Sequence, residues 1–104
     1  GCCINAVSLS EICVGDEFPD RVTDRLTAWG VSILDIPAAA SEICATAYRE
    51  YRKRRTAQSG TSSPAMPLPD FFIGAHARIM NWDIATVDPG RFRTYFPSVS
   101  LIVP

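Results

Sequence analysis

Four short apolar segments, separated by stretches with helical periodicity, most constrain what this chain can fold into. The segments expected to be strands are residues 3–7, 31–36, 84–87 and 99–103. Strands that alternate with helices in this way form a mainly parallel sheet with helices on both faces. The sequence therefore predicts an α/β fold, and residues 1–104 have an ordinary length for one domain with its own hydrophobic core.

Two helices are expected between the first two strands. Ser8-Leu-Ser-Glu11 is a good capping box, so the first helix should start there, directly after the strand. Asp20 is expected to cap the second helix, because apolar residues recur after it at helical spacing. Gly30 stands where the C-terminal stop of that helix belongs.

Two longer helices are expected in the second half of the chain. Pro37 opens the first, which ends in the basic run 52–55, where cations suit a helix C-terminus. The second runs from Asp70 to Met80, and its Gly74 would permit close packing against a sheet. Residues 56–69 have neither period and form a predicted loop, and loops this long are often functional.

Composition excludes several classes of protein. The chain is 47% hydrophobic and 20% charged, which is typical of a globular domain, and no apolar run approaches the roughly 20 residues that cross a bilayer. The first residues lack a secretory pattern, so a cytoplasmic protein is the default expectation. The net charge of −1 argues against bulk attraction of nucleic acid but allows a local patch. The cysteines form no CxxC pair, which disfavours zinc, and Cys3 and Cys13 are expected in the core.

Three acidic residues are the best candidates for chemistry, namely Glu11, Asp70 and Asp88. Each lies just after a predicted strand or at a helix start, and ligands of parallel α/β sheets bind beyond the carboxyl ends of the strands. Three carboxylates that converge repel one another unless a cation joins them, and Mg²⁺ and Mn²⁺ prefer oxygen ligands. The sequence therefore predicts that these residues form one divalent metal site.

Each acid also has a purely structural explanation. Glu11 could reach back to a backbone N–H within the capping box. Asp70 could be an ordinary helix-start acid that interacts with the helix dipole, and Asp88-Pro-Gly could be an ordinary turn. Taken singly, none of the three residues establishes a metal site.

Several segments resemble PIN-domain proteins, and most closely the VapC-type toxins of bacterial toxin–antitoxin pairs. In order, these are Leu-Pro-Asp-Phe-Phe-Ile-Gly-Ala-His-Ala from Leu68, then Ala-Thr-Val-Asp88, Arg-Phe-Arg-Thr-Tyr-Phe-Pro and Leu-Ile-Val-Pro. Upstream, the segment from Ile4 to Glu11 resembles the family's second strand and acidic helix. The resemblance implies a three-layer α/β/α fold and a Mg²⁺- or Mn²⁺-dependent endoribonuclease. In it, Glu11, Asp70 and Asp88 would be catalytic and would hold the metal.

Two departures from the family pattern stand out. The usual Thr-Arg-Asp is Thr86-Val87-Asp88 here, which loses a basic side chain, and no strand with an Asp-x-Asn motif precedes Ile4. That strand would be central, so its loss should leave two half-sheets with unpaired inner edges. We therefore expect an N-terminally incomplete PIN-like domain, truncated or completed by another molecule, or else a shortened, inactive member of the family.

The resemblance also implies partners. They are an RNA substrate, an antitoxin protein that blocks the site, and a second copy in a homodimer. The basic run is the best candidate to guide an RNA backbone, through Arg52, Arg54 and Arg55, although a solvated helix end explains it equally well. His76 lies among apolar residues, which indicates a structural role rather than a general base.

Two other functions remain open from the sequence. One is a catalytically inactive PIN-like module that binds a protein partner. The other is a different α/β phosphotransfer enzyme, such as an acid-site phosphatase or a receiver domain. Binding of magnesium and cleavage of RNA would separate an active nuclease from an inactive module.

Overall fold

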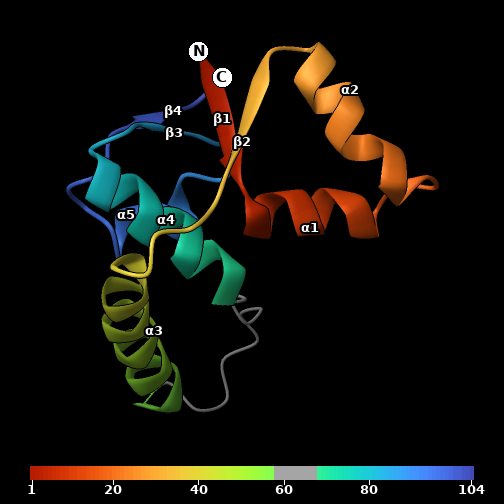
Figure 1. The fold of residues 1–104 in the computed structure, drawn as a ribbon. Coiled ribbons are helices and arrows are strands. Elements are labelled where there is room, and N and C mark those ends of the chain that lie inside the picture. The colour runs from red at the N-terminus through yellow and green to blue at the C-terminus, as the bar shows by residue number, and fades with distance from the viewer. Residues whose placement is uncertain (58–67) are drawn as a thin grey trace. The chain divides into compact units, whose positions relative to one another are not determined.

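The computed structural model describes residues 1–57 and 68–104 and divides into two compact units, Gly1–Ile36 and Pro37–Pro104 (Figure 1). Within the described residues, each unit combines helices with one pair of strands, and both pairs are parallel. The predicted α/β class with parallel strands is therefore confirmed. The strands form two sheets of two strands each, which is the division expected from the sequence.

The first unit is built on one parallel strand pair. Its elements are β1 (Cys2–Asn5), α1 (Ala6–Val14), the 3-10 helix η1 (Pro19–Arg21), α2 (Val22–Ala28) and β2 (Val31–Leu34). Cys2 lies opposite Val31, and the register continues to Asn5 opposite Leu34. Val22 and Leu26, one helical turn apart, are the buried residues of α2. The chain turns from α2 into β2 at Gly30. The φ of +80° there is unfavourable for other residues, which explains the glycine.

The helix starts of this unit differ from those predicted. The side chain of Asn5 caps α1 and accepts a hydrogen bond from the Ser8 N–H at 3.0 Å. Ser8 therefore lies inside the helix, and the predicted capping box from Ser8 to Glu11 is wrong. Asp20 lies within η1, and α2 starts after Arg21 without a side-chain cap.

Two cysteines predicted for the core lie elsewhere. Cys3 is exposed and Cys13 is half-buried, whereas Cys44 in the second unit is buried. The only buried residue of β1 is Asn5, and α1 has none, so neither segment buries an apolar side chain in this structure.

The second unit holds the larger core. Its elements are α3 (Ala40–Ala57), α4 (Leu68–Met80), β3 (Ile84–Ala85), α5 (Gly90–Arg93) and β4 (Leu101–Ile102). The longest helix starts at Ala40 rather than directly at Pro37, whose carbonyl accepts the Ala40 N–H at 2.9 Å. Ile84 pairs with Leu101, and Ala85 pairs with Ile102. Both strands therefore have two residues and are shorter than the predicted strands at 84–87 and 99–103. Part of the predicted loop at 56–69 is helical at each end, and residues 58–67 lie outside the described residues.

Aromatic rings hold α3, α4 and the segment after α5 together. Phe71 on α4 is fully buried, and its ring centroid lies 5.2 Å from that of Tyr48 and 5.4 Å from that of Tyr51 on α3. From the other side Tyr95 and Phe96 approach it at 5.5 and 6.2 Å. Large buried rings dominate the energy of a small core, so this cluster fixes how the second unit packs.

Gly74 lies at the closest approach in this packing. A Cβ atom added there would lie 2.3 Å from the ring of Phe96, far inside van der Waals contact. The sequence predicted a close contact at Gly74 with a sheet, whereas the structure shows an aromatic side chain in contact. No helix in the described ranges is long and apolar enough to span a membrane.

Candidate active site

Asp70 is a buried carboxylate at the start of α4. It is the third residue of that helix and is only 5% exposed. A negative charge in the first turn interacts favourably with the helix dipole, which offsets part of the cost of burial. The start of α4 after Pro69 thus stabilises a buried carboxylate whose charge would be costly elsewhere in the core.

Asp88 approaches from the end of β3. The Thr86 N–H donates to the carbonyl of Ile102 at 3.0 Å, which extends the ladder between β3 and β4 by one step. The Thr86 hydroxyl then accepts the Asp88 N–H at 3.0 Å and shapes the turn that leads into α5. Asp88 itself is exposed.

Arg91 joins the two carboxylates. Its Nη1 donates to Asp70 Oδ2 at 2.8 Å, and its Nε donates to Asp88 Oδ2, also at 2.8 Å. The hydrogen bond that Arg91 donates to Asp88 and the charge of Asp70 raise the pKa of Arg91 above its ordinary value. One guanidinium therefore occupies the space that both acids face.

The structure thus brings together two of the three predicted acids. Asp70 and Asp88 are both in the second unit. Glu11 is exposed on α1 in the first unit, so its convergence with the other two stays a prediction. Among the described residues, no three side chains of His, Cys, Asp or Glu form a group that could hold a metal ion.

Two carboxylates nevertheless suit a magnesium-type ion. Such ions take oxygen ligands and commonly use one or two carboxylates, with water and substrate phosphate supplying the rest. Asp70 and Asp88 already lie on two sides of one cationic group, and both use Oδ2 toward it. The donor set fits a divalent cation provided that Arg91 moves away.

Arg91 was not assigned a role from the sequence. It was expected only to lie in a helical turn after Pro89 and Gly90. The signal that could have revealed its pairing with Asp88 is the spacing of three residues, which brings oppositely charged side chains together on a helical turn. Its contact with Asp70, 21 positions away, has no local signal.

His76 agrees with the structural role expected from the sequence. It is 6% exposed in the middle of α4, and its ring centroid lies 5.6 Å from that of Trp82. Burial lowers the pKa of His76, since it disfavours the charged imidazolium.

Comparison with known proteins identifies the fold. No protein-family model matches the chain, and no curated protein matches it. A chain in the crystal structure of DNA-bound VapBC from Salmonella typhimurium is similar, with a TM-score of 0.69 and 19% sequence identity. The match covers 97% of the present chain and 74% of the other.

A second crystal structure leads to the same conclusion. In VapBC2 from Rickettsia felis bound to a DNA fragment from its promoter, a chain matches with a TM-score of 0.59 and 21% identity. The match covers 97% of the present chain and 73% of that chain. The chain therefore has the PIN-like α/β fold found in these VapBC structures.

Proposed function

We propose that the chain is a toxin-type, metal-dependent endoribonuclease with the fold of the VapBC chains, and that Asp70 and Asp88 hold its Mg²⁺ or Mn²⁺. The observation that carries the proposal is the position of the two carboxylates. Each has an oxygen 2.8 Å from a nitrogen of the same guanidinium, so one cation can satisfy both. The similarity to the VapBC chains supports the fold on which the proposal rests.

The chemistry follows from the two carboxylates and their surroundings. A divalent cation held there would lower the pKa of water and neutralise negative charge on a phosphodiester. Asp70 is buried in the first turn of α4, whereas Asp88 is exposed and therefore accessible to a substrate. In this proposal Glu11 either joins the ligands or orients the attacking water, and the protein supplies no covalent nucleophile.

The test is the substitution Asp70→Asn, which keeps the shape of the side chain and removes its charge. We expect cleavage of single-stranded RNA in Mn²⁺ or Mg²⁺ to fall by at least about 100-fold, because even outer-shell changes cost metal sites 10- to 100-fold. Asp83→Asn is the matched control, since Asp83 is an exposed acid in the same unit. It should cleave within about twofold of the unaltered protein.

Circular dichroism should show that both variants are folded. Cleavage by Asp70→Asn at the unaltered rate, or cleavage that persists in EDTA, would refute the proposed mechanism.

One observation favours a second candidate, a catalytically inactive PIN-like module that binds a protein. The Arg91 guanidinium already forms an ion pair with each carboxylate, which reduces the need for a metal. An inactive module would show no metal-dependent cleavage and no rise in melting temperature on addition of Mn²⁺. The active enzyme should show both.

A partner protein belongs to the same proposal. The similar chains come from VapBC complexes with bound DNA. We infer by analogy that an antitoxin protein covers the acidic site of this chain, and that the chain forms a homodimer. We expect an inhibitory protein to co-purify, with RNA cleavage appearing after its removal, and light scattering to give the mass of two copies. Full cleavage in the purified complex would contradict the first part, and a monomer mass the second.

A further inference from the structure

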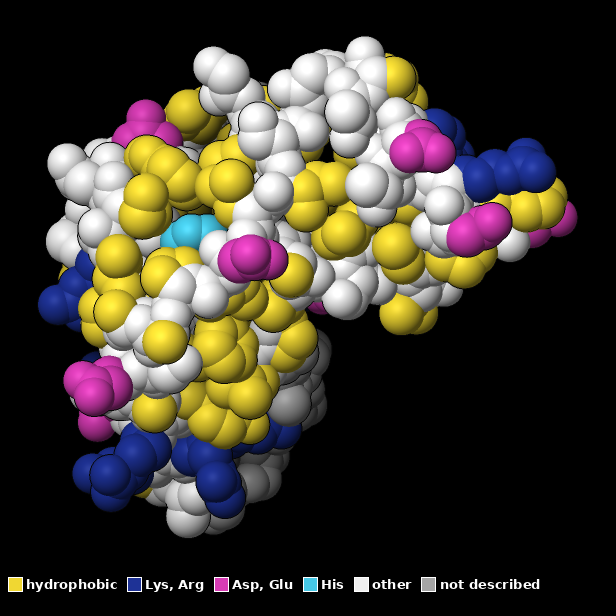
Figure 2. Space-filling model, viewed as in Figure 1, with side chains coloured by type: hydrophobic (Ala, Val, Ile, Leu, Met, Phe, Trp, Pro, Cys, Tyr) yellow, Lys and Arg dark blue, Asp and Glu magenta, His cyan; other side chains and the backbone are white. Residues whose placement is uncertain are grey.

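Charge is divided unevenly between the two units. The first carries two Arg and Lys against six Asp and Glu, a formal −4, whereas the second carries eight against five, a formal +3. Five of those eight basic residues lie on α3 between residues 49 and 55. Figure 2 shows dark blue Lys and Arg side chains gathered over the C-terminal part of α3. The overall charge of −1 therefore conceals a basic surface.

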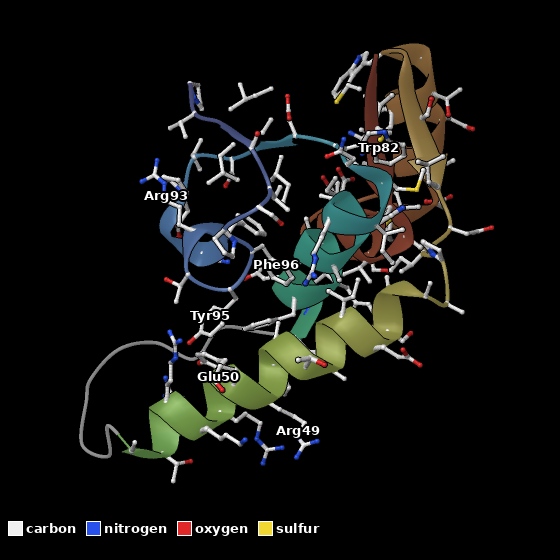
Figure 3. All side chains as sticks on the ribbon, turned by 90° about the vertical axis from the view of Figure 1, so that its left-hand side faces the viewer. Arg49, Glu50, Trp82, Arg93, Tyr95 and Phe96 are labelled. Carbon is white, nitrogen blue, oxygen red and sulfur yellow. The ribbon has the colours of Figure 1, made fainter. Side chains whose placement is uncertain are left out.

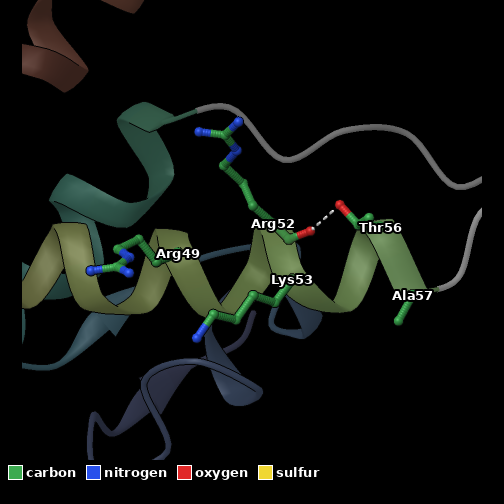
Figure 4. A pocket seen from close by; sticks show the side chains of 5 residues that line it. All are labelled: Arg49, Arg52, Lys53, Thr56 and Ala57. Atoms are coloured by element: carbon green, nitrogen blue, oxygen red, sulfur yellow. Dashed lines mark hydrogen bonds between the residues drawn. The ribbon is translucent and has the colours of Figure 1, made fainter.

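Four of these cations form what we call the basic strip, which consists of Arg49, Arg52, Lys53 and Arg78. Arg49 and Lys53 are one helical turn apart on α3, so they lie on the same face. They line two adjoining hollows of about 510 and 470 Å³. The first continues along α3 to Arg52 (Figure 4), and the second crosses to Arg78 on α4.

The strip is free to bind a ligand. Across residues 1–57 and 68–104, none of its four side chains has an ion-pair partner in the structure. The segment 58–67, which follows α3, contains no acidic residue that could supply one. Cations that lie near one another on a surface repel each other, so an anionic ligand would relieve an unfavourable arrangement.

Two neighbouring arginines are engaged differently. Arg54 pairs with Glu50 at 3.2 Å and lies 5.3 Å from the centre of the Tyr95 ring, and Figure 3 shows Glu50 and Tyr95 on facing elements. Arg55 contacts the hydroxyl of Tyr51 at 3.4 Å. The RNA contacts expected at Arg54 and Arg55 stay predictions. Both side chains already contact other residues of the unit, whereas Arg49, Lys53 and Arg78 have no ion-pair partner among the described residues.

We propose that the basic strip binds the phosphodiester backbone of single-stranded RNA. This inference deepens the proposed function, on which it rests for the choice of RNA. In the first hollow, cations without an aromatic side chain between them suit repeated phosphates, whereas protein interfaces need buried apolar anchors. Among the described residues, the hollow around Arg52 is lined otherwise by Thr56 and Ala57, whereas the second hollow also includes Ile43, Glu50 and Tyr95.

The strip also lies at a suitable distance from the acidic site. Arg78 follows Asp70 by eight positions on the same helix, which corresponds to roughly 12 Å along its axis. At about 3.4 Å or more per nucleotide, a few nucleotides span that length. One RNA strand can therefore contact the strip and reach the carboxylates.

The experiment compares two double variants of equal charge. Arg49→Gln with Arg78→Gln removes two cations from the strip, and Arg21→Gln with Arg93→Gln removes two exposed cations elsewhere. Binding of a fluorescein-labelled, single-stranded RNA oligonucleotide is measured by anisotropy in EDTA over a range of salt concentrations. We expect the strip variant alone to bind more weakly. The slope of log K against log salt should become shallower by about 1.4, at about 0.7 per lost phosphate contact.

Two outcomes would overturn the inference. The first is unchanged affinity in the strip variant, and the second is equal weakening in both variants, which would reflect net charge only. Polyglutamate, a model for an acidic protein, provides a third test. If the strip variant loses binding to polyglutamate but binds RNA as before, the strip belongs to an acidic protein and the inference is overturned.

Binding in EDTA separates this inference from the ribonuclease proposal. Asp70→Asn should bind RNA like the unaltered protein. If RNA binds through the strip but is never cleaved, only the ribonuclease proposal fails. If RNA is cleaved but the strip variant binds normally, only the strip inference fails.

Discussion

At the scale of single residues, Arg91 is the side chain that compensates the negative charge of the acidic site. A carboxylate as buried as Asp70 is costly unless a cation or hydrogen bonds compensate its charge. Arg91 supplies both from a side chain that is itself 46% exposed, so it can leave toward solvent. We therefore view Arg91 and a divalent metal as competitors for the same two carboxylates.

This competition gives a measurable prediction for Arg91→Gln. Loss of the guanidinium should lower the free energy of unfolding by roughly 1–3 kcal/mol, because the buried Asp70 carboxylate loses the side chain that donates to it. It should also lower the Kd for Mn²⁺ by about fivefold, the equivalent of about 1 kcal/mol, because no bound cation has to be displaced. Calorimetric titration with Mn²⁺ measures the Kd, and thermal melting measures the stability.

Arg93→Gln is the matched control on the same helix. Arg93 is exposed and has no ion-pair partner within the described parts of the chain. Its substitution should leave Mn²⁺ binding unchanged. Equal Mn²⁺ affinity in Arg91→Gln and the unaltered protein would show that Arg91 does not compete with the metal.

At the scale of elements, α4 connects the site to the core. Its first turn holds Asp70 and its next turn brings Gly74 against Phe96. The same helix buries Phe71 within the aromatic cluster. The position of the carboxylate therefore depends on how closely α4 approaches the segment after α5.

Gly74→Ala tests this dependence. Its new methyl group would overlap the Phe96 ring, so either the ring or the helix must shift. We expect the free energy of unfolding to fall by roughly 1–3 kcal/mol, as for other overpacked cores. Chemical denaturation measures this change.

The control is Gly15→Ala, where an added Cβ meets only a backbone oxygen at 3.8 Å and φ is −86°. It should cost far less, because no side chain has to move. Similar losses at both positions would mean that the contact between Gly74 and Phe96 is not what limits the packing.

At the scale of the whole molecule, the single histidine contributes to the change of stability with pH. Burial lowers the pKa of His76, so the folded state binds fewer protons there than the unfolded state, whose pKa is near 6.5. Stability from this group is fully present above pH 6.5 and falls as the pH drops toward the lower folded pKa.

The prediction concerns the chain as a whole, measured by its unfolding. Between about pH 7.5 and about pH 5.5, the unaltered protein should lose more stability than His76→Gln, which has no group that titrates at this position. Denaturation curves at the two pH values give both differences. A loss of the same size in the two proteins would rule out His76 as the source.

Much of the fold follows from local patterns. The four strands, the helix from 70 to 80 and the long helix before the basic run were all predictable, because apolar periodicity reports which face is buried. Helix starts were less predictable. Asn5 and Ser8 are both residue types that cap helices well, and Asn5 is the cap of α1. Which of the two caps the helix depends on where the strand before it ends.

The acidic character of the site was determined by the sequence, since Asp70 lies in the first turn of α4 and Asp88 in the turn after β3. Only the tertiary structure decided that Arg91, 21 positions beyond Asp70, lies between the two carboxylates. It also decided which basic residues of α3 have no ion-pair partner among residues 1–57 and 68–104. The physical reason is that spacing along the chain controls contacts within a turn or a helix. A contact between distant residues depends instead on how α4, α5 and the aromatic core pack together, and no local pattern encodes that packing.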